Sequence, residues 1–169
     1  MSEPKAKVRT TRWGDRKTFL QLWRPFMEEQ HAEGSMVRPS DHNLRQYCQL
    51  FESYTVGSLF GFGVLAFVDE RPVGVGLFGE DTGAINLETD FGKAGTAWGQ
   101  YVDPSYRKKG IGHQMLTYCY REAMAMGFQC VITSVLLNSE AARANALNYP
   151  GVQAYSTVVY SRLSEVPVL

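Results

Sequence analysis

The chain has 169 residues, of which 44% are hydrophobic and 20% charged, which is typical of one compact domain and rules out disorder as its main content. Its 17 basic and 17 acidic residues cancel, which argues against a general binder of nucleic acid or of membrane surfaces, so any anion site must be local. The apolar runs are too short to span a membrane, the N-terminus has no signal-peptide pattern, and the cysteines and histidines lack disulfide or metal-site spacing, which predicts a cytoplasmic protein with reduced thiols and no metal.

The N-terminal third of the chain predicts one strand followed by two helices. The alternating stretch "KVRTTRW" at 7–13 indicates the strand, and Asp15 fits the N-cap of the first helix. Pro25 lies inside that helical pattern and should kink or divide it, and the segment 28–40 is polar and irregular. Asp41 is expected to cap the second helix.

The rest of the chain alternates strand and helix patterns within one domain, 1–169. The predicted order is strands at 62–70 and 71–80, a polar segment at 80–95, a strand at 96–103, a helix over Ile111–Met126, a strand at 129–137, a short helix capped by Asn138 and a last strand at 152–163. The first two of these strands form a hairpin, and the later strands alternate with helices. The pattern therefore predicts an α/β fold with a mixed, mostly antiparallel sheet and helices on both faces.

The segment "GVGLFG" at Gly74–Gly79 matches the GxGxxG pattern of dinucleotide-binding proteins. That pattern binds a pyrophosphate only where it ends a strand and opens a helix. Here the glycines lie within a predicted strand and a polar turn follows them. We interpret them as a close backbone approach or a bulge in a strand.

The segment "RKKGIG" at Arg107–Gly112 has the context that the first motif lacks. A predicted strand ends just before it, and a predicted helix starts at Ile111. The glycines Gly110 and Gly112 leave backbone N–H groups unshielded, and the start of the helix adds free donors and a partial positive charge. With the charges of Arg107, Lys108 and Lys109, the segment predicts a pyrophosphate site. The alternative is a basic surface turn whose glycines serve only backbone geometry.

These residues resemble the GCN5-related N-acetyltransferase (GNAT) family. The family pattern Arg/Gln-x-x-Gly-x-Gly/Ala matches Arg107–Gly112, and the preceding "YVDPSY" is similar to the family's lead-in to that pattern. The order of elements also agrees from about residue 7 to residue 163. The resemblance implies acetyl-CoA or another acyl-CoA as a substrate, and two central parallel strands that splay apart to admit its pantetheine arm.

The resemblance also implies site residues. Besides Arg107, Lys108, Lys109, Gly110, Ile111 and Gly112, the CoA-binding residues would be Asn138 and the backbone of Gln100, Tyr101 and Val102. Gly99 would mark a bulge, or would only make room for a neighbouring aromatic ring. The backbone N–H of Val102 would stabilise the oxyanion of the transition state. Tyr149 would be either the general acid or a packing aromatic, because its spacing from Asn138 departs from the family's.

The function that follows from the resemblance is transfer of an acetyl group from acetyl-CoA to a primary amine of a small molecule or peptide by direct attack. The alternative is an acyl-CoA-binding or sensor protein without turnover, because no general base stands out. The acidic residues in 27–43 fit a solvated helix face better than an amine site. We expect no nucleic acid and no membrane among the partners. Proteins of this kind are commonly dimers, so a homodimer is the alternative to a monomer.

Overall fold

The computed structural model describes residues 5–35, 37–55, 60–80 and 93–133, together with residues 140, 143 and 144. The elements are β1 (Lys7–Thr10), η1 (Trp13–Asp15), α1 (Arg16–Ala32), α2 (Asp41–Thr55), β2 (Gly61–Val68), β3 (Arg71–Gly79), β4 (Ala94–Val102), η2 (Pro104–Tyr106), α3 (Ile111–Ala125) and β5 (Cys130–Thr133). Most of the segment 80–95, the helix predicted after Asn138 and the strand predicted at 152–163 lie outside the described residues. None of the described helices is long and apolar enough to cross a membrane.

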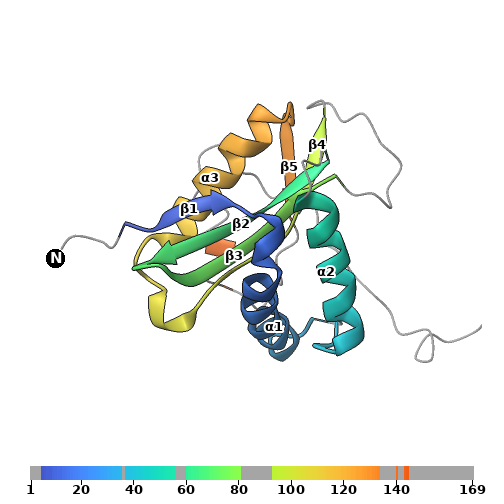
Figure 1. The fold of residues 1–169 in the computed structure, drawn as a ribbon, viewed down its shortest axis with the longest axis vertical. Coiled ribbons are helices and arrows are strands. Elements are labelled where there is room, and N and C mark those ends of the chain that lie inside the picture. Colours follow the sequence, from blue (N-terminus) through green and yellow to red (C-terminus); the bar gives the residue numbers. More distant parts are fainter. Residues whose placement is uncertain are drawn as a thin grey trace, which may run out of the picture.

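The described strands form one open sheet in the order β1-β2-β3-β4-β5 (Figure 1). Each strand from β1 to β3 pairs antiparallel with the next, and β4 pairs parallel with β5. The parallel pair is joined through α3, since parallel neighbours need a crossover connection. The predicted mixed, mostly antiparallel sheet is therefore confirmed.

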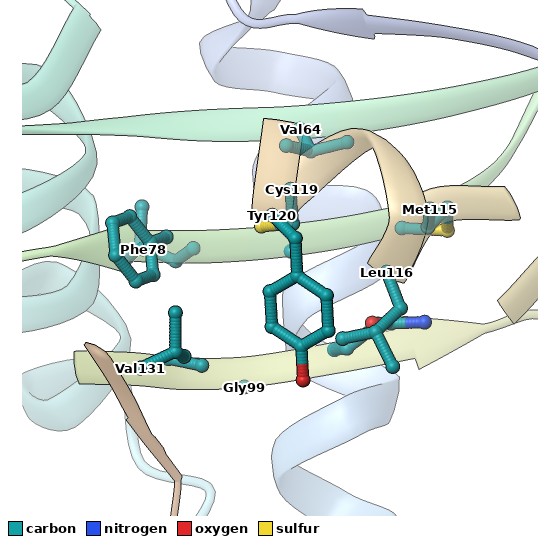
Figure 2. Close-up of a pocket in the computed structure, with 12 residues that line it drawn as sticks. Val64, Phe78, Gly99, Met115, Leu116, Cys119, Tyr120 and Val131 are labelled. Carbon is teal, nitrogen blue, oxygen red and sulfur yellow. The ribbon is translucent and has the colours of Figure 1, made fainter. Parts of the chain in front are cut away.

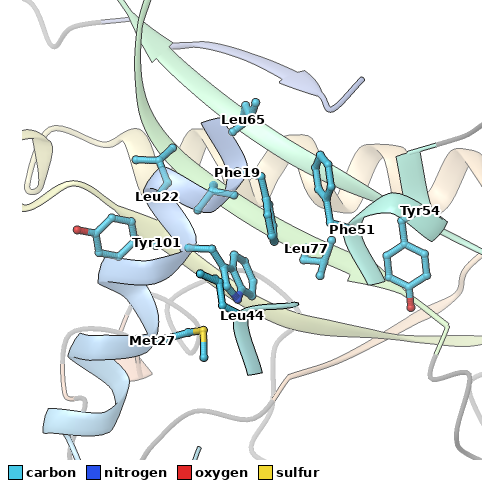
Figure 3. Packing of buried hydrophobic residues seen from close by; sticks show 11 residues of the cluster. Phe19, Leu22, Met27, Leu44, Phe51, Tyr54, Leu65, Leu77 and Tyr101 are labelled. Carbon is cyan, nitrogen blue, oxygen red and sulfur yellow. The ribbon is translucent and has the colours of Figure 1, made fainter. Parts of the chain in front are cut away.

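Helices cover both faces of the sheet, as predicted. On one face α1 and α2 pack through a cluster that includes Phe19, Trp23 and Phe51 against Leu65 and Leu77 of the sheet (Figure 3). On the other face α3 packs through a second cluster, whose members include Ile111, Met115, Val64, Ala66 and Phe78. The alternation of side chains along β2 and β3 thus supplies two apolar layers, and the sheet is buried on both sides.

Helix α1 is longer than the sequence predicts. It runs through Pro25 without a break and ends at Ala32, inside the segment expected to be irregular. A proline in a helix removes one backbone hydrogen bond, which costs about 3 kcal/mol. Here Trp23 and Met27, on either side of Pro25, are buried in the core. The burial of this apolar face offsets the cost of the proline.

The N-cap of α2 is Ser40 and not Asp41. The Ser40 hydroxyl accepts a hydrogen bond from the N–H of Asn43 at 3.2 Å, and its carbonyl accepts one from Leu44 at 2.9 Å. The carboxylate of Asp41 instead accepts a 2.6 Å hydrogen bond from Arg24 on α1. The sequence "PSD" offers two capping residues in a row, and the tertiary contact decides between them.

The glycines of the GxGxxG match lie in β3, and among the described residues no helix follows them directly. A Cβ on Gly74 would lie 2.5 Å from the sulfur of Met115, and one on Gly79 would collide with the ring of Tyr54. The glycines therefore allow α3 and α2 to approach the sheet closely. This confirms the interpretation as a close backbone approach.

Asp15 does not cap α1 with its side chain. Its carboxylate accepts hydrogen bonds from both terminal nitrogens of Arg9, at 2.7 and 2.8 Å, and from the backbone N–H of Arg12 at 2.7 Å. The hydrogen bonds from Arg9 are the main cause that lowers the pKa of Asp15 below its ordinary value of 3.8. Since the charged form is favoured in the fold, this contact stabilises the protein above the ordinary pKa and is lost as the pH falls below it.

Asp15→Asn is expected to lower the free energy of unfolding by about 1–3 kcal/mol at pH 7, because a two-pronged charge-assisted contact is replaced by a neutral one. Urea unfolding at several pH values measures it. The difference from the wild type should shrink between pH 4 and pH 2. Asp41→Asn, which breaks a pair with an exposed carboxylate, is the control and should have a smaller effect. If the loss of unfolding free energy in Asp15→Asn were undiminished at pH 2, the stabilisation would not come from the ionised carboxylate of Asp15.

Candidate active site

Strand β4 contains a bulge at Trp98. In the pairing with β3, Leu77 lies opposite Gly99 and Phe78 lies opposite Ala97, which leaves Trp98 without a partner residue. A Cβ on Gly99 would lie 2.6 Å from the ring of Phe26 on α1. Both sequence interpretations of Gly99 therefore hold, because it flanks the bulge and also makes room for an aromatic ring. The extra residue itself is Trp98.

Among the described residues, β5 pairs with only the first part of the edge of β4 that faces it. The parallel pairing runs from Ala94 opposite Cys130 to Ala97 opposite Thr133, and no other described residue pairs with this edge of β4 farther along. The N–H of Asp103 donates to the carbonyl of Val73 on β3. Since backbone groups alternate along a strand, those of Gln100 and Val102 point away from β3, toward the side of β5. The family resemblance assigns the backbone of Gln100, Tyr101 and Val102 to CoA, and by the same alternation the backbone groups of Tyr101 face β3.

A small cavity lies between α3 and the sheet next to the bulge (Figure 2). Its lining residues come from β2, β3, β4, β5 and α3, and they include Gly99, Gln100, Leu116, Cys119 and Tyr120. Its volume is about 30 Å³, which is room for one water molecule and not for a substrate arm. Figure 2 shows the ring of Tyr120 extending from α3 toward β4 and Gly99. Burial raises the pKa of the Cys119 thiol to about 12, so this thiol stays protonated at neutral pH.

The loop before α3 exposes backbone donors. Lys108 and Gly110 have φ angles of 58° and 71°, in the left-handed region, and α3 begins at Ile111. Within the described part of the chain, no hydrogen bond involves the N–H groups of Ile111 and Gly112. They belong to the first helical turn, whose donors have no partner within the helix. The side-chain amide of Gln100 donates to the carbonyl of Gly112 at 2.7 Å and so ties this turn to β4.

The three basic side chains of the loop differ in their surroundings. Arg107 donates to the carbonyl of Val102 at 2.8 Å and to the carboxylate of Glu29 at 2.5 Å. Lys109 donates to the carbonyl of Ser105 at 3.0 Å. Lys108 is not hydrogen-bonded or ion-paired to any residue that the structure describes. The charge of Arg107 is therefore balanced by the carboxylate of Glu29, whereas the charge of Lys108 is not balanced by any described residue.

Two predicted site residues, Asn138 and Tyr149, lie outside the described residues. The structure brings the others together at the junction of β4 and α3: Gln100, Tyr101, Val102, Arg107, Lys108, Lys109, Gly110, Ile111 and Gly112. Tyr101 is buried against α1, and burial raises the pKa of its hydroxyl. Among the described residues no group of three or more His, Cys, Asp or Glu side chains could hold a metal ion.

Glu29 was predicted to lie on a solvated helix face, but it accepts a hydrogen bond from Arg107, which lies 78 residues away in the chain. No local pattern predicts a contact over that separation. The sequence offers one signal, the cluster of acidic residues near the end of α1, and this cluster does not indicate which basic residue it contacts.

Comparison with known proteins agrees with this geometry. A model of the acetyltransferase (GNAT) family matches residues 16–146. Among solved structures, a predicted acetyltransferase with acetyl-CoA from Clostridium acetobutylicum is 16% identical, with a TM-score of 0.72 over 95% of this chain and 98% of that chain. No curated protein sequence matches the chain.

Two further solved structures are of enzymes that are named for the molecule they acetylate. An aminoglycoside N-acetyltransferase in complex with CoA is 18% identical, with a TM-score of 0.64 over 94% of each chain. A ribosomal-protein-alanine N-acetyltransferase from Brucella melitensis biovar Abortus is 16% identical, with a TM-score of 0.66 over 94% of this chain and 99% of that chain. At these identities the structures show a shared fold. Since the family model covers more than half of the chain, the protein belongs to the acetyltransferase (GNAT) family and is an N-acetyltransferase by class.

Proposed function

We propose that this protein transfers an acetyl group from acetyl-CoA to the primary amine of a small molecule or peptide by direct attack of the amine on the thioester. One observation carries the proposal. The N–H groups of Ile111 and Gly112, which have no hydrogen-bond partner among the described residues, follow a loop in which Lys108 and Gly110 lie in the left-handed region, and a bulged strand precedes this loop. Open donors at a helix start suit a diphosphate.

The residues of this chain fit acetyl-CoA as a substrate. The loop supplies backbone donors and the charge of Lys108, and the β5-side edge of β4 supplies the backbone groups of Gln100 and Val102. We assign the N–H of Val102 to stabilising the developing oxyanion, since a fixed backbone dipole needs no reorganisation during the reaction. Tyr149 stays the proposed proton donor to the leaving sulfur.

Direct attack is favoured over a route through an acyl-cysteine. The cysteine that lines the cavity, Cys119, has its pKa raised by burial to about 12 and so holds little thiolate at neutral pH. The amine must be neutral to attack, although a primary amine with a pKa of about 10.4 is mostly protonated at pH 7. A group that accepts this proton is therefore expected near the acceptor.

The acceptor class is proposed as an amine of a small molecule or a peptide. Structural neighbours include an enzyme named for aminoglycosides and one named for the alanine of a ribosomal protein, and both names fit this class. The three cysteines are all free thiols, which supports a cytoplasmic location. A homodimer and a single domain over 1–169 also remain proposals.

A thermal shift measurement with acetyl-CoA and with free CoA tests the proposal. At a hundredfold excess over Kd, binding stabilises the fold by about 2.7 kcal/mol. For a chain of this size the unfolding temperature should rise by roughly 5–10 °C. Sodium sulfate at matched ionic strength controls for nonspecific anion binding. No shift with either ligand would remove the proposed function.

The second candidate is an acyl-CoA-binding or sensor protein without turnover. It is favoured by the spacing between Asn138 and Tyr149, which departs from the family pattern for the proton donor. This candidate predicts the same thermal shift. It differs in predicting that no amine releases the CoA thiol from acetyl-CoA.

A further inference from the structure

The guanidinium of Arg107 joins the end of β4 to helix α1. Its Nε donates to the carbonyl of Val102 at 2.8 Å, a terminal nitrogen donates to Glu29 at 2.5 Å, and its central carbon lies 5.4 Å from the centre of the Tyr101 ring. The side chains of Arg107 and Glu29 are 38% and 32% exposed, so neither is fully solvated. Contacts on three sides hold the guanidinium in one orientation.

The contact between Arg107 and the Val102 carbonyl lies at the edge of β4 that faces away from β3. This carbonyl points away from β3, so in a continued parallel sheet it would bond to the strand on the other side. Here a donor from Arg107 satisfies it. This carbonyl belongs to the peptide that joins Val102 to Asp103, one peptide along from the N–H proposed to face the thioester. The bond from Arg107 thereby fixes the end of β4 next to that N–H.

We propose that Glu29 is a positioning residue for CoA binding, which acts by holding Arg107 against the carbonyl of Val102 and so fastens the end of β4 to helix α1. This inference rests on the proposed function, because it concerns the same CoA site. Glu29 itself need not touch the ligand. It acts through Arg107, because its carboxylate keeps the guanidinium turned toward α1.

The electrostatic surroundings agree with this geometry. The hydrogen bond that Arg107 donates to Glu29 is the largest cause that raises the pKa of Arg107, and the negative charges of Glu29 and Glu33 act in the same direction. Glu33 is also contacted by the side chain of Gln30 on the same helix. The acidic end of α1 thus favours the charged guanidinium in this position.

Isothermal titration of CoA into the wild type, Glu29→Gln, Arg107→Ala and the double variant tests the inference. Glu29→Gln is expected to raise the Kd for CoA about tenfold, within the range of coupling found for residues in direct contact. The double variant should bind no more weakly than Arg107→Ala alone, because Glu29 acts only through Arg107. Arg107→Lys, which keeps the charge but lacks the forked donors, should also bind CoA more weakly than the wild type.

Asp41→Asn is the matched control. It removes a different ion pair, between Arg24 on α1 and Asp41 on α2, whose nitrogen and oxygen atoms lie 2.6 Å apart. Neither residue belongs to the loop before α3. Its Kd for CoA should equal that of the wild type, whatever its effect on the unfolding temperature. A general loss of stability would act on both variants, whereas a positioning role acts on Glu29→Gln alone.

The outcomes separate the inference from the proposed function. Wild-type protein that fails to bind CoA would overturn both. If the wild type binds CoA and Glu29→Gln binds it equally well, only the role of Glu29 is wrong. Tighter CoA binding by Glu29→Gln would show that Glu29 competes with the diphosphate for Arg107, which also overturns the inference. The inference is likewise wrong if the double variant raises the Kd by the product of the two single increases, because Glu29 would then act independently of Arg107.

Discussion

Gly112→Leu is expected to raise the Kd for CoA by at least about a hundredfold while the protein stays folded. The N–H groups of Ile111 and Gly112 are open at the start of α3, and a leucine side chain in this turn would fill the space that a diphosphate needs. Leucine forms helices better than glycine by roughly 0.8 kcal/mol, so the helix itself is not weakened. Isothermal titration and thermal unfolding measure the two effects separately.

The control is Gly14→Leu in η1. Gly14 is exposed, and a Cβ there would meet no atom within 4 Å. This variant should bind CoA like the wild type. If Gly112→Leu loses stability and CoA affinity together, the glycine serves only the backbone, and the loop is a structural turn.

Trp23→Ala is expected to destabilise the protein by about 3–5 kcal/mol, which is a large part of the roughly 5–15 kcal/mol that a domain has. Trp23 is fully buried and lies against the rings of Phe19, Phe26 and Tyr47, with centroid distances of 4.9, 4.9 and 5.2 Å. It also lies beneath the bulge, since a Cβ on Gly99 would be 3.3 Å from its ring. Its removal leaves a cavity between α1 and β4.

Urea unfolding measures this loss. Trp13→Ala is the control, because Trp13 is 63% exposed, and its effect should stay within about 0.5 kcal/mol. Trp23→Phe should cost less than Trp23→Ala, since the indole N–H has no partner among the described residues and only volume is lost. A loss below 1 kcal/mol for Trp23→Ala would mean that this cluster does not support the site.

The sequence predicts well those features that a short segment determines. The α3 helix, its start after Gly110 and its end before Gly127 follow from periodicity and from two glycines with positive φ. The hairpin of β2 and β3 follows in the same way from two apolar runs and an acidic turn. Each of these features depends on neighbours in the chain, so a local pattern contains the necessary information.

Features that depend on distant residues were not predictable. The bond between Arg107 and Glu29 joins parts of the chain that meet only after α1 packs against the sheet. The bulge falls at Trp98 because the register with β3 slips by one residue there, and the sequence indicated only the neighbouring Gly99. Ser40 replaced Asp41 as the cap because Arg24, on another helix, binds Asp41. In each case tertiary packing chose between options that the local sequence left equal.

The most direct test of acetyl transfer is the release of the CoA thiol from acetyl-CoA in the presence of amines. The panel should include polyamines, aminoglycosides, amino acids and peptides with free N-termini, with Gly112→Leu as the inactive control and Gly14→Leu as the active one. Amine-dependent thiol release by the wild type and by Gly14→Leu, absent with Gly112→Leu, is the predicted result. Binding of CoA without thiol release for any amine would contradict the account and would leave a CoA-binding protein without turnover.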